Sequence, residues 1–215
     1  MLAAIADQSR RNAALRFVYV FLALMAAVIA ASLLLQGVDV ALRRETGGVE
    51  IASVLTTACA AILAVVLMQR HDRGLYSVAA LLALFALREL DFHDWWFEPG
   101  LLHAGIFQSA APLWQKLVSG LTMAAILAVL ADVAIRGLRP FLRALRAGHG
   151  WARLVIAGGF LVVLSILLDG LPARLGPEMS QGAARIAGIV EECGELALFA
   201  CLLLAVAVWP SRPPA

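Results

Sequence analysis

Long apolar runs separated by short polar segments fill almost the whole chain. Six of these runs are candidates for membrane-spanning helices, because about 20 consecutive apolar residues cross the hydrocarbon core of a bilayer. They cover approximately residues 17–35, 49–68, 75–92, 113–135, 154–168 and 186–209. The pattern therefore predicts an all-α fold: a bundle of six transmembrane helices that forms one membrane-embedded domain over residues 1–215.

The first apolar run has an alternative interpretation as the core of a secretory signal peptide. Arg10, Arg11 and Arg16 precede it, and residues 27–31 include several small side chains. However, the run continues to Leu35, which is longer than the apolar core of a signal peptide. The pattern favours an uncleaved first span.

Two of the polar segments carry patterns typical of a membrane surface. Residues 93–112 are rich in aromatic side chains, which favour the membrane–water boundary, and residues 101–107 are expected to form a short helix there. Residues 136–153 contain five arginines and no acid, interleaved with apolar side chains. This second segment is predicted to be amphipathic and to lie on an anionic membrane surface.

The distribution of basic residues predicts the orientation. Arginine and lysine gather in the cytoplasmic loops of membrane proteins. The N-terminal segment, the segment between the second and third spans, and the segment between the fourth and fifth together hold ten, against five on the opposite side. The protein is therefore expected to have both termini in the cytoplasm.

Composition supports a membrane location and indicates a bacterial source. Hydrophobic residues make up 62% of the chain and charged residues only 15%, whereas about a quarter of a soluble domain is charged. Lys116 is the single lysine among 17 basic residues, a bias typical of a GC-rich bacterial genome, so the bacterial inner membrane is the expected location. No basic tract is long enough to indicate nucleic-acid binding. The three cysteines lie in apolar runs without a CxxC pair and are expected to be small core residues.

Acidic residues gather at the outward ends of three predicted spans. Glu89 and His93 share one face at the end of the third span, and Arg88 and Asp91 are spaced to form an ion pair. The fifth span ends at Asp169, and the first turns of the sixth carry Glu191, Glu192 and Glu195. The second span begins on the same side with Glu50, Ser53 and Thr57 on one face.

Carboxylates grouped with an imidazole suit a divalent metal ion such as zinc, iron or manganese. The proposed ligands are Glu89, His93, Asp169, Glu191, Glu192 and Glu195, with Arg88 and Asp91 as a supporting pair. A bound metal ion would activate water, which makes hydrolysis of a lipid-like substrate the first functional hypothesis. The lipid bilayer and a lipid-like ligand are the expected partners.

Other functions remain open at this point. The same acids could line the path of a proton- or cation-coupled transporter or channel, or form structural pairs in a membrane scaffold subunit. Acids at helix ends also reach headgroups or complement the helix dipole without any further function. Haem is not expected, because it usually needs paired histidines deep in the bundle. Retinal is not expected, because it would need a buried lysine. A nucleotide is not expected either, because no nucleotide-binding motif occurs.

Overall fold

Every regular element that the structure describes is a helix. The computed structural model describes residues 2–43, 47–68, 75–92, 96–98, 100–175 and 180–209, with the side chains of residues 2–7, 10, 43, 68, 75 and 169–175 excepted. The elements are α1 (Leu2–Gln36), α2 (Val38–Arg43), α3 (Gly48–Met68), α4 (Leu75–Glu89), the 3-10 helix η1 (Ala104–Phe107), α5 (Leu113–Arg146), α6 (Gly150–Leu175) and α7 (Gln181–Ala207). The predicted all-α class is confirmed.

Four of these helices are long and apolar enough to cross a membrane. They are the stretches Arg11–Gln36, Gly48–Leu67, Leu113–Arg146 and Gly150–Leu168, which belong to α1, α3, α5 and α6. The chain is thus a helical membrane protein. The other two predicted spans differ from these four: α4 has only 15 residues, and α7 carries three glutamates near its middle.

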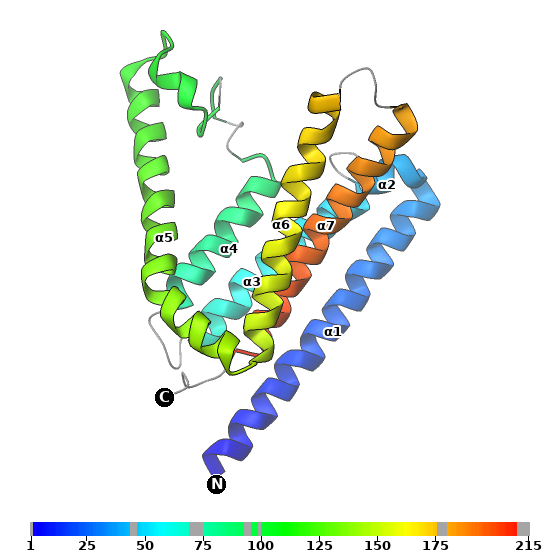
Figure 1. Ribbon diagram of the computed structural model, residues 1–215, viewed down its shortest axis with the longest axis vertical. Helices are drawn as coiled ribbons and strands as arrows, with labels where there is room; N and C mark the ends of the chain where they lie inside the picture. Colours follow the sequence, from blue (N-terminus) through cyan, green and yellow to red (C-terminus); the bar gives the residue numbers. More distant parts are fainter. Residues whose placement is uncertain are drawn as a thin grey trace.

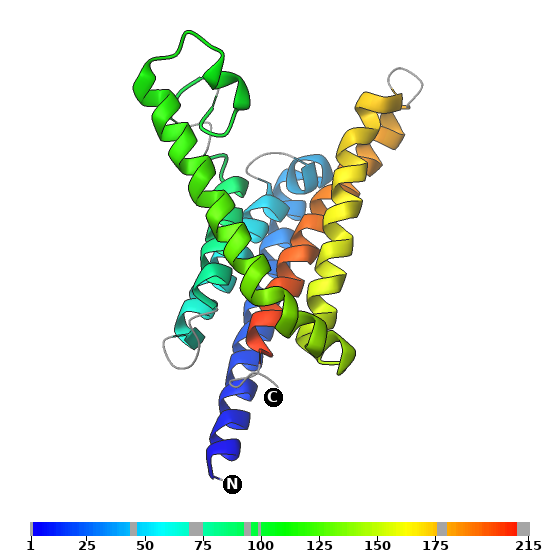
Figure 2. The same ribbon diagram turned by 60° about the vertical axis from the view of Figure 1, so that its left-hand side comes forward.

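The helices form a packed group from which α5 diverges (Figure 1). Helix α6 packs along α7, α3 lies between α4 and α7, and α1 covers α3 and α7. Helix α5 leans away from α6 at one end and approaches it at the other, as both views show (Figure 2). We call the end where α3 and α7 begin and α4 ends the acidic end. The opposite end, which holds residues 136–153, is the arginine end.

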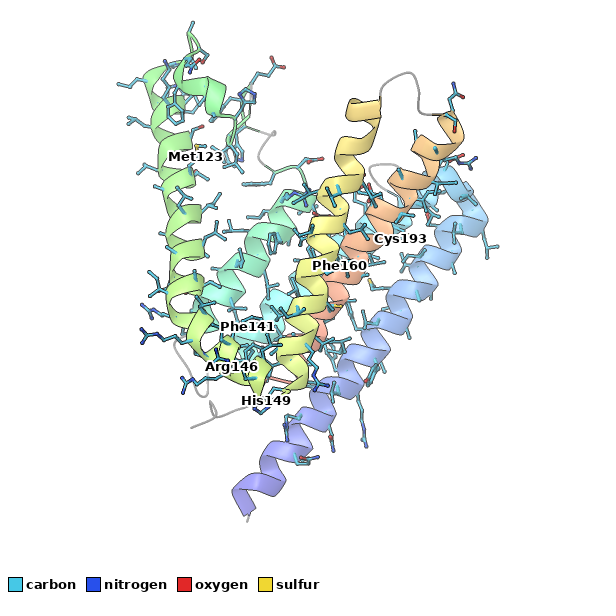
Figure 3. The ribbon with its side chains drawn as sticks, in the orientation of Figure 1. Met123, Phe141, Arg146, His149, Phe160 and Cys193 are labelled. Carbon is cyan, nitrogen blue, oxygen red and sulfur yellow. The ribbon has the colours of Figure 1, made fainter. Side chains whose placement is uncertain are left out.

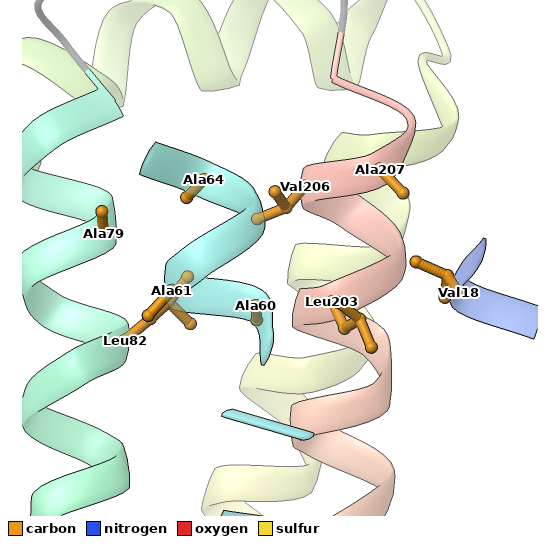
Figure 4. Packing of buried hydrophobic residues seen from close by; sticks show 9 residues of the cluster. All are labelled: Val18, Ala60, Ala61, Ala64, Ala79, Leu82, Leu203, Val206 and Ala207. Carbon is orange, nitrogen blue, oxygen red and sulfur yellow. The ribbon is translucent and has the colours of Figure 1, made fainter. Parts of the chain in front are cut away.

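Small side chains bring the central helices together. The main core contains Ala60, Ala61 and Ala64 of α3, packed with Leu82 of α4 and Leu203 of α7 (Figure 4). Alanine at such a contact allows helix backbones to approach closely, which favours association in a bilayer. This layer fixes the register of α3, α4 and α7 and thereby the level of every residue above it.

A second core ties the arginine end together. Its buried residues are Ala144, Trp151, Ala152 and Ala205, and the rings of Trp151 and Trp209 lie 4.1 Å apart between centroids. The turn between α5 and α6 contains Gly148 at a positive φ, a conformation that glycine adopts without steric strain. The turn therefore anchors α5 to the end of α7 even though α5 diverges elsewhere.

Several helices extend beyond the predicted spans. Helix α1 begins at Leu2 rather than near residue 17. Helix α5, which contains Pro140, continues to Arg146 and bends in its lower part (Figure 1). Asp169 was expected to begin a loop, but α6 continues through it to Leu175. The reason is that hydropathy locates the bilayer core, whereas backbone hydrogen bonding continues into the interface. The expected short helix at 101–107 is the single turn η1.

Candidate functional site

The register of the core brings acidic residues of three helices to one level. From the layer that contains Ala60, Leu82 and Leu203, two helical turns toward the acidic end correspond to about seven residues. This step leads to Ser53 on α3, Glu89 on α4 and the neighbourhood of Glu195 on α7. The convergence predicted from topology therefore follows from antiparallel packing of α4, and parallel packing of α7, against α3.

Arg88 joins two of these carboxylates. Its Nη1 donates to Oε1 of Glu89 at 2.9 Å and to Oε1 of Glu195 at 3.4 Å. Its Nη2 also donates to Oε1 of Glu195 at 3.4 Å. The two contacts to Glu195 are longer than the usual length of an N–H···O bond, about 2.7–3.2 Å, and are correspondingly weak. A single guanidinium thus bridges α4 and α7.

Ser165 brings α6 to the same carboxylate. Its hydroxyl donates to Oε1 of Glu195 at 3.4 Å, and its side chain is buried. Sequence analysis did not identify this residue. The available signal was a polar side chain within an apolar run, one helical turn before Asp169.

The carboxylates lie deeper than their counterion. The side chain of Glu89 is only 7% exposed and that of Glu195 is 17% exposed, whereas Arg88 is 61% exposed. The guanidinium therefore lies at the mouth of the site and the acids lie beneath it.

Two further carboxylates make the site strongly negative. Glu50 and Glu192 lie close enough to Glu89 and to each other for their charges to interact. We define the acidic cluster as Glu50, Glu89, Glu192 and Glu195, with Arg88 as its counterion. In the described structure, Arg88 contacts Glu89 and Glu195. Carboxylates grouped in this way are costly away from bulk water unless they are paired, protonated or bound to a cation.

A layer of hydroxyl groups continues from the acidic cluster into α3. Thr57 donates to the backbone oxygen of Ser53 at 2.8 Å, which satisfies its own hydroxyl. The hydroxyl oxygens of Ser53 and Thr56 are buried without a hydrogen-bond partner in the described part of the chain. A buried polar group without a partner is unusual and often marks a site for water or an ion.

The polar layer ends against an apolar core. Phe199 is 1% exposed and packs against Phe85, with ring centroids 6.3 Å apart. Leu203, Ala60 and Ala64 follow, all fully buried. In the described core, this packing separates the acidic cluster from the arginine end. Asp132, near that opposite end, instead accepts from Ser77 and pairs with Arg136 at 2.6 Å.

The remaining predicted site residues are placed as follows. Asp91 lies at a φ of 48° in the turn that ends α4, where its N–H bonds the Arg88 oxygen. The charge of Glu191 acts on the adjacent Glu192. His93 lies outside the described residues, and so does the side chain of Asp169. Within the described ranges, no three His, Cys, Asp or Glu side chains are gathered as ligands of one metal ion.

Comparison of the chain with protein-family models, with curated proteins and with solved structures found no match.

Proposed function

We propose that this chain is a six-span protein of the bacterial inner membrane whose acidic cluster faces outward and binds a cation. In this arrangement α4 and α7 cross the membrane beside the four longer helices, and both termini lie in the cytoplasm. The excess of arginine at the opposite end supports this orientation, because basic residues gather on the cytoplasmic side. The acidic cluster then lies at the outward-facing surface of the inner membrane.

The main support for the proposal is one observation: a single nitrogen, Arg88 Nη1, donates to carboxylate oxygens of both Glu89 and Glu195. The two acids already surround a position that holds positive charge. Glu50 and Glu192 add negative charge to that position, and the exposed Arg88 occupies it, with long contacts to Glu195. A free cation would compete with the guanidinium for the same place.

A divalent metal ion is the cation that we infer for this site. Carboxylate oxygens bind zinc, iron and manganese, and four carboxylates provide the charge such an ion requires. His93 and Asp169, whose side chains lie outside the described ones, and Glu191 complete the predicted ligand set. When bound, the ion would lower the pKa of a water molecule for hydrolysis. A lipid-like substrate suits this position, since the acidic cluster lies where lipid headgroups would be.

Transport of protons or cations is the second candidate, and the packing supports it less. A path would need polar groups between the acidic cluster and the arginine end. Phe199, Leu203 and the core alanines occupy that region in the described structure. A scaffold role, in which Arg88 only pairs α4 with α7, is the remaining alternative and is separated from cation binding by the experiment below.

The test is the metal content of the detergent-purified protein, measured by elemental mass spectrometry. We expect near-stoichiometric divalent metal in the parent protein and loss of most of it in Glu89→Gln, Glu195→Gln and His93→Ala. Each glutamine keeps the shape of the side chain and removes its charge. Protein that holds metal would then be assayed for hydrolysis of phospholipids, with and without a chelator.

Glu98→Gln is the matched control, because Glu98 is an exposed carboxylate outside the acidic cluster. This variant should retain its metal. Absence of metal from a folded parent protein, also after incubation with zinc, iron or manganese, would contradict the proposal. In that case, normal thermal stability of Glu195→Gln would indicate proton coupling, and a large loss of stability would indicate a structural ion pair.

A further inference from the structure

A pocket opens at the arginine end, away from the acidic cluster. It has a volume of about 650 Å³ and is lined by Arg11 of α1, by Val208 after α7, and by His149, Gly150, Trp151, Arg153, Leu154 and Ala157 of the α5–α6 turn and α6. His149 lies at this end of the molecule, next to the turn that joins α5 to α6 (Figure 3). Three elements distant in sequence therefore build one pocket.

The pocket is basic. Arg11, His149 and Arg153 contribute positive or titratable groups, and none of the lining residues is acidic. The guanidinium of Arg153 lies close to the turn. Its Nη2 would be 2.9 Å from a Cβ added to Gly148. Gly150 begins α6, so the positive end of the helix dipole adds positive potential at the same place. The pocket is built to receive an anion.

The lining also contains apolar side chains. These are Trp151, Leu154, Ala157 and Val208, and Trp151 is in contact with Trp209. The indole N–H of Trp151 is buried without an acceptor in the described part of the chain. A phosphate alone would use only the basic groups of the lining, whereas a phospholipid would place its headgroup on the arginines and its glycerol and acyl carbons against the apolar side chains.

We propose that this pocket binds the phosphate headgroup of an anionic phospholipid in the cytoplasmic leaflet. The arginines at the adjacent end of α5 (Arg136, Arg139, Arg143 and Arg146) attract anionic lipid to the surface, and the pocket selects one molecule from it. The bound lipid would join α1 to the α5–α6 turn, which otherwise hold few contacts with each other in the described structure. This site is separate from the acidic cluster, and only its assignment to the cytoplasmic leaflet rests on the orientation proposed above.

Native mass spectrometry of the delipidated full-length protein tests the proposal. Phosphatidylglycerol, phosphatidylcholine and inorganic phosphate are titrated separately. We expect one phosphatidylglycerol to bind most tightly, with phosphatidylcholine weaker and inorganic phosphate without measurable retention. Arg11→Gln and Arg153→Gln should each weaken phosphatidylglycerol binding about fivefold, the effect of one basic group at an anionic lipid surface.

Arg139→Gln is the matched control, since it removes one exposed arginine of α5 that does not line the pocket. It should leave the affinity for the first phosphatidylglycerol nearly unchanged. An equal loss in all three variants would show general surface attraction and overturn the proposal. Binding of inorganic phosphate as strong as that of the lipid would also overturn it, in favour of a site for a soluble anion. Thermal melting of each variant confirms that it is folded before the titration.

Discussion

Arg88 is the positively charged side chain that contacts the acidic cluster in the described structure. It is the more exposed member of both its ion pairs, while Glu89 and Glu195 lie deeper and remain close to Glu50 and Glu192. If Arg88 only stabilised the fold, its removal would weaken the structure without a gain in metal affinity. If Arg88 occupies a cation site, it competes with the free ion, and its removal would raise the metal affinity. These two roles predict opposite effects when the charge is removed.

We therefore expect Arg88→Gln to bind divalent metal more tightly than the parent protein, by about tenfold, because the competing charge is gone. Without metal, the variant should unfold more easily, with a loss of about 1 kcal/mol that reflects the exposure of the guanidinium. Isothermal titration with manganese measures the affinity, and SDS-induced unfolding measures the stability.

Arg136→Gln serves as the control, since Arg136 pairs with Asp132 far from the acidic cluster. It should not change the manganese affinity. Weaker manganese binding in Arg88→Gln than in the parent protein would contradict a shared cation position and would make Arg88 a structural residue.

The sequence predicts the level of the site but not its pairs. The acids of α4 and α7 could be placed together because topology determines which helix ends meet. From the sequence, Glu195 could be protonated, paired with Arg88 or bound to a cation. Its contact with Arg88 and the approach of Ser165 depend on the rotation of each helix about its axis. Hydropathy in helices that are apolar on all sides carries little information on rotation. Asp91 could not be placed because the left-handed turn at the end of α4 removes it from the helix face.

At the scale of the elements, α1 and α3 approach each other closely at Gly48, which has no side chain. A Cβ added to Gly48 would lie 2.6 Å from Cβ of Ser32 and 3.2 Å from Cα of Ile29, both on α1. The second of these atoms is backbone and cannot rotate away. The contact holds the start of α3, and with it Glu50, against α1.

Gly48→Ala should therefore separate the two helices and lower the free energy of unfolding by about 1–3 kcal/mol, the usual effect of overpacking. Gly159→Ala is the matched control, because nothing lies within 4 Å of a Cβ at that position of α6. It should not destabilise the protein. SDS-induced unfolding followed by circular dichroism checks both, and equal stability of the two variants would contradict the close approach of α1 to α3.

The elements also show where sequence patterns stop being informative. Apolar runs locate the start of α3 almost to the residue, because α3 is apolar over almost its whole length. They miss the first turns of α1 and the last turns of α5 and α6, where polar residues continue the helix. In these parts backbone hydrogen bonds continue the helix, and they do not depend on hydropathy.

For the whole molecule, the central question is whether α4 and α7 cross the membrane with the four longer helices. Helix α4 has 15 residues. At a rise of about 1.5 Å per residue, its length is roughly 22 Å, which is shorter than the apolar core of a bilayer, about 30 Å. Its packing against α3 nevertheless favours a crossing helix, since a helix on the surface could not follow α3 through the bilayer. The crossing of α4 determines the side on which residues 96–112 lie.

Single cysteines in a variant without Cys59, Cys193 and Cys201 test this arrangement. We expect Ala110→Cys and Ser180→Cys, both at exposed positions of the acidic end, to react with a membrane-impermeant maleimide in intact cells. Ala147→Cys, exposed in the α5–α6 turn, should react only after permeabilisation. Labelling of Ala110→Cys only after permeabilisation would mean that α4 does not cross. The acidic cluster would then face no single aqueous side, and a cation site open to the outside would be excluded.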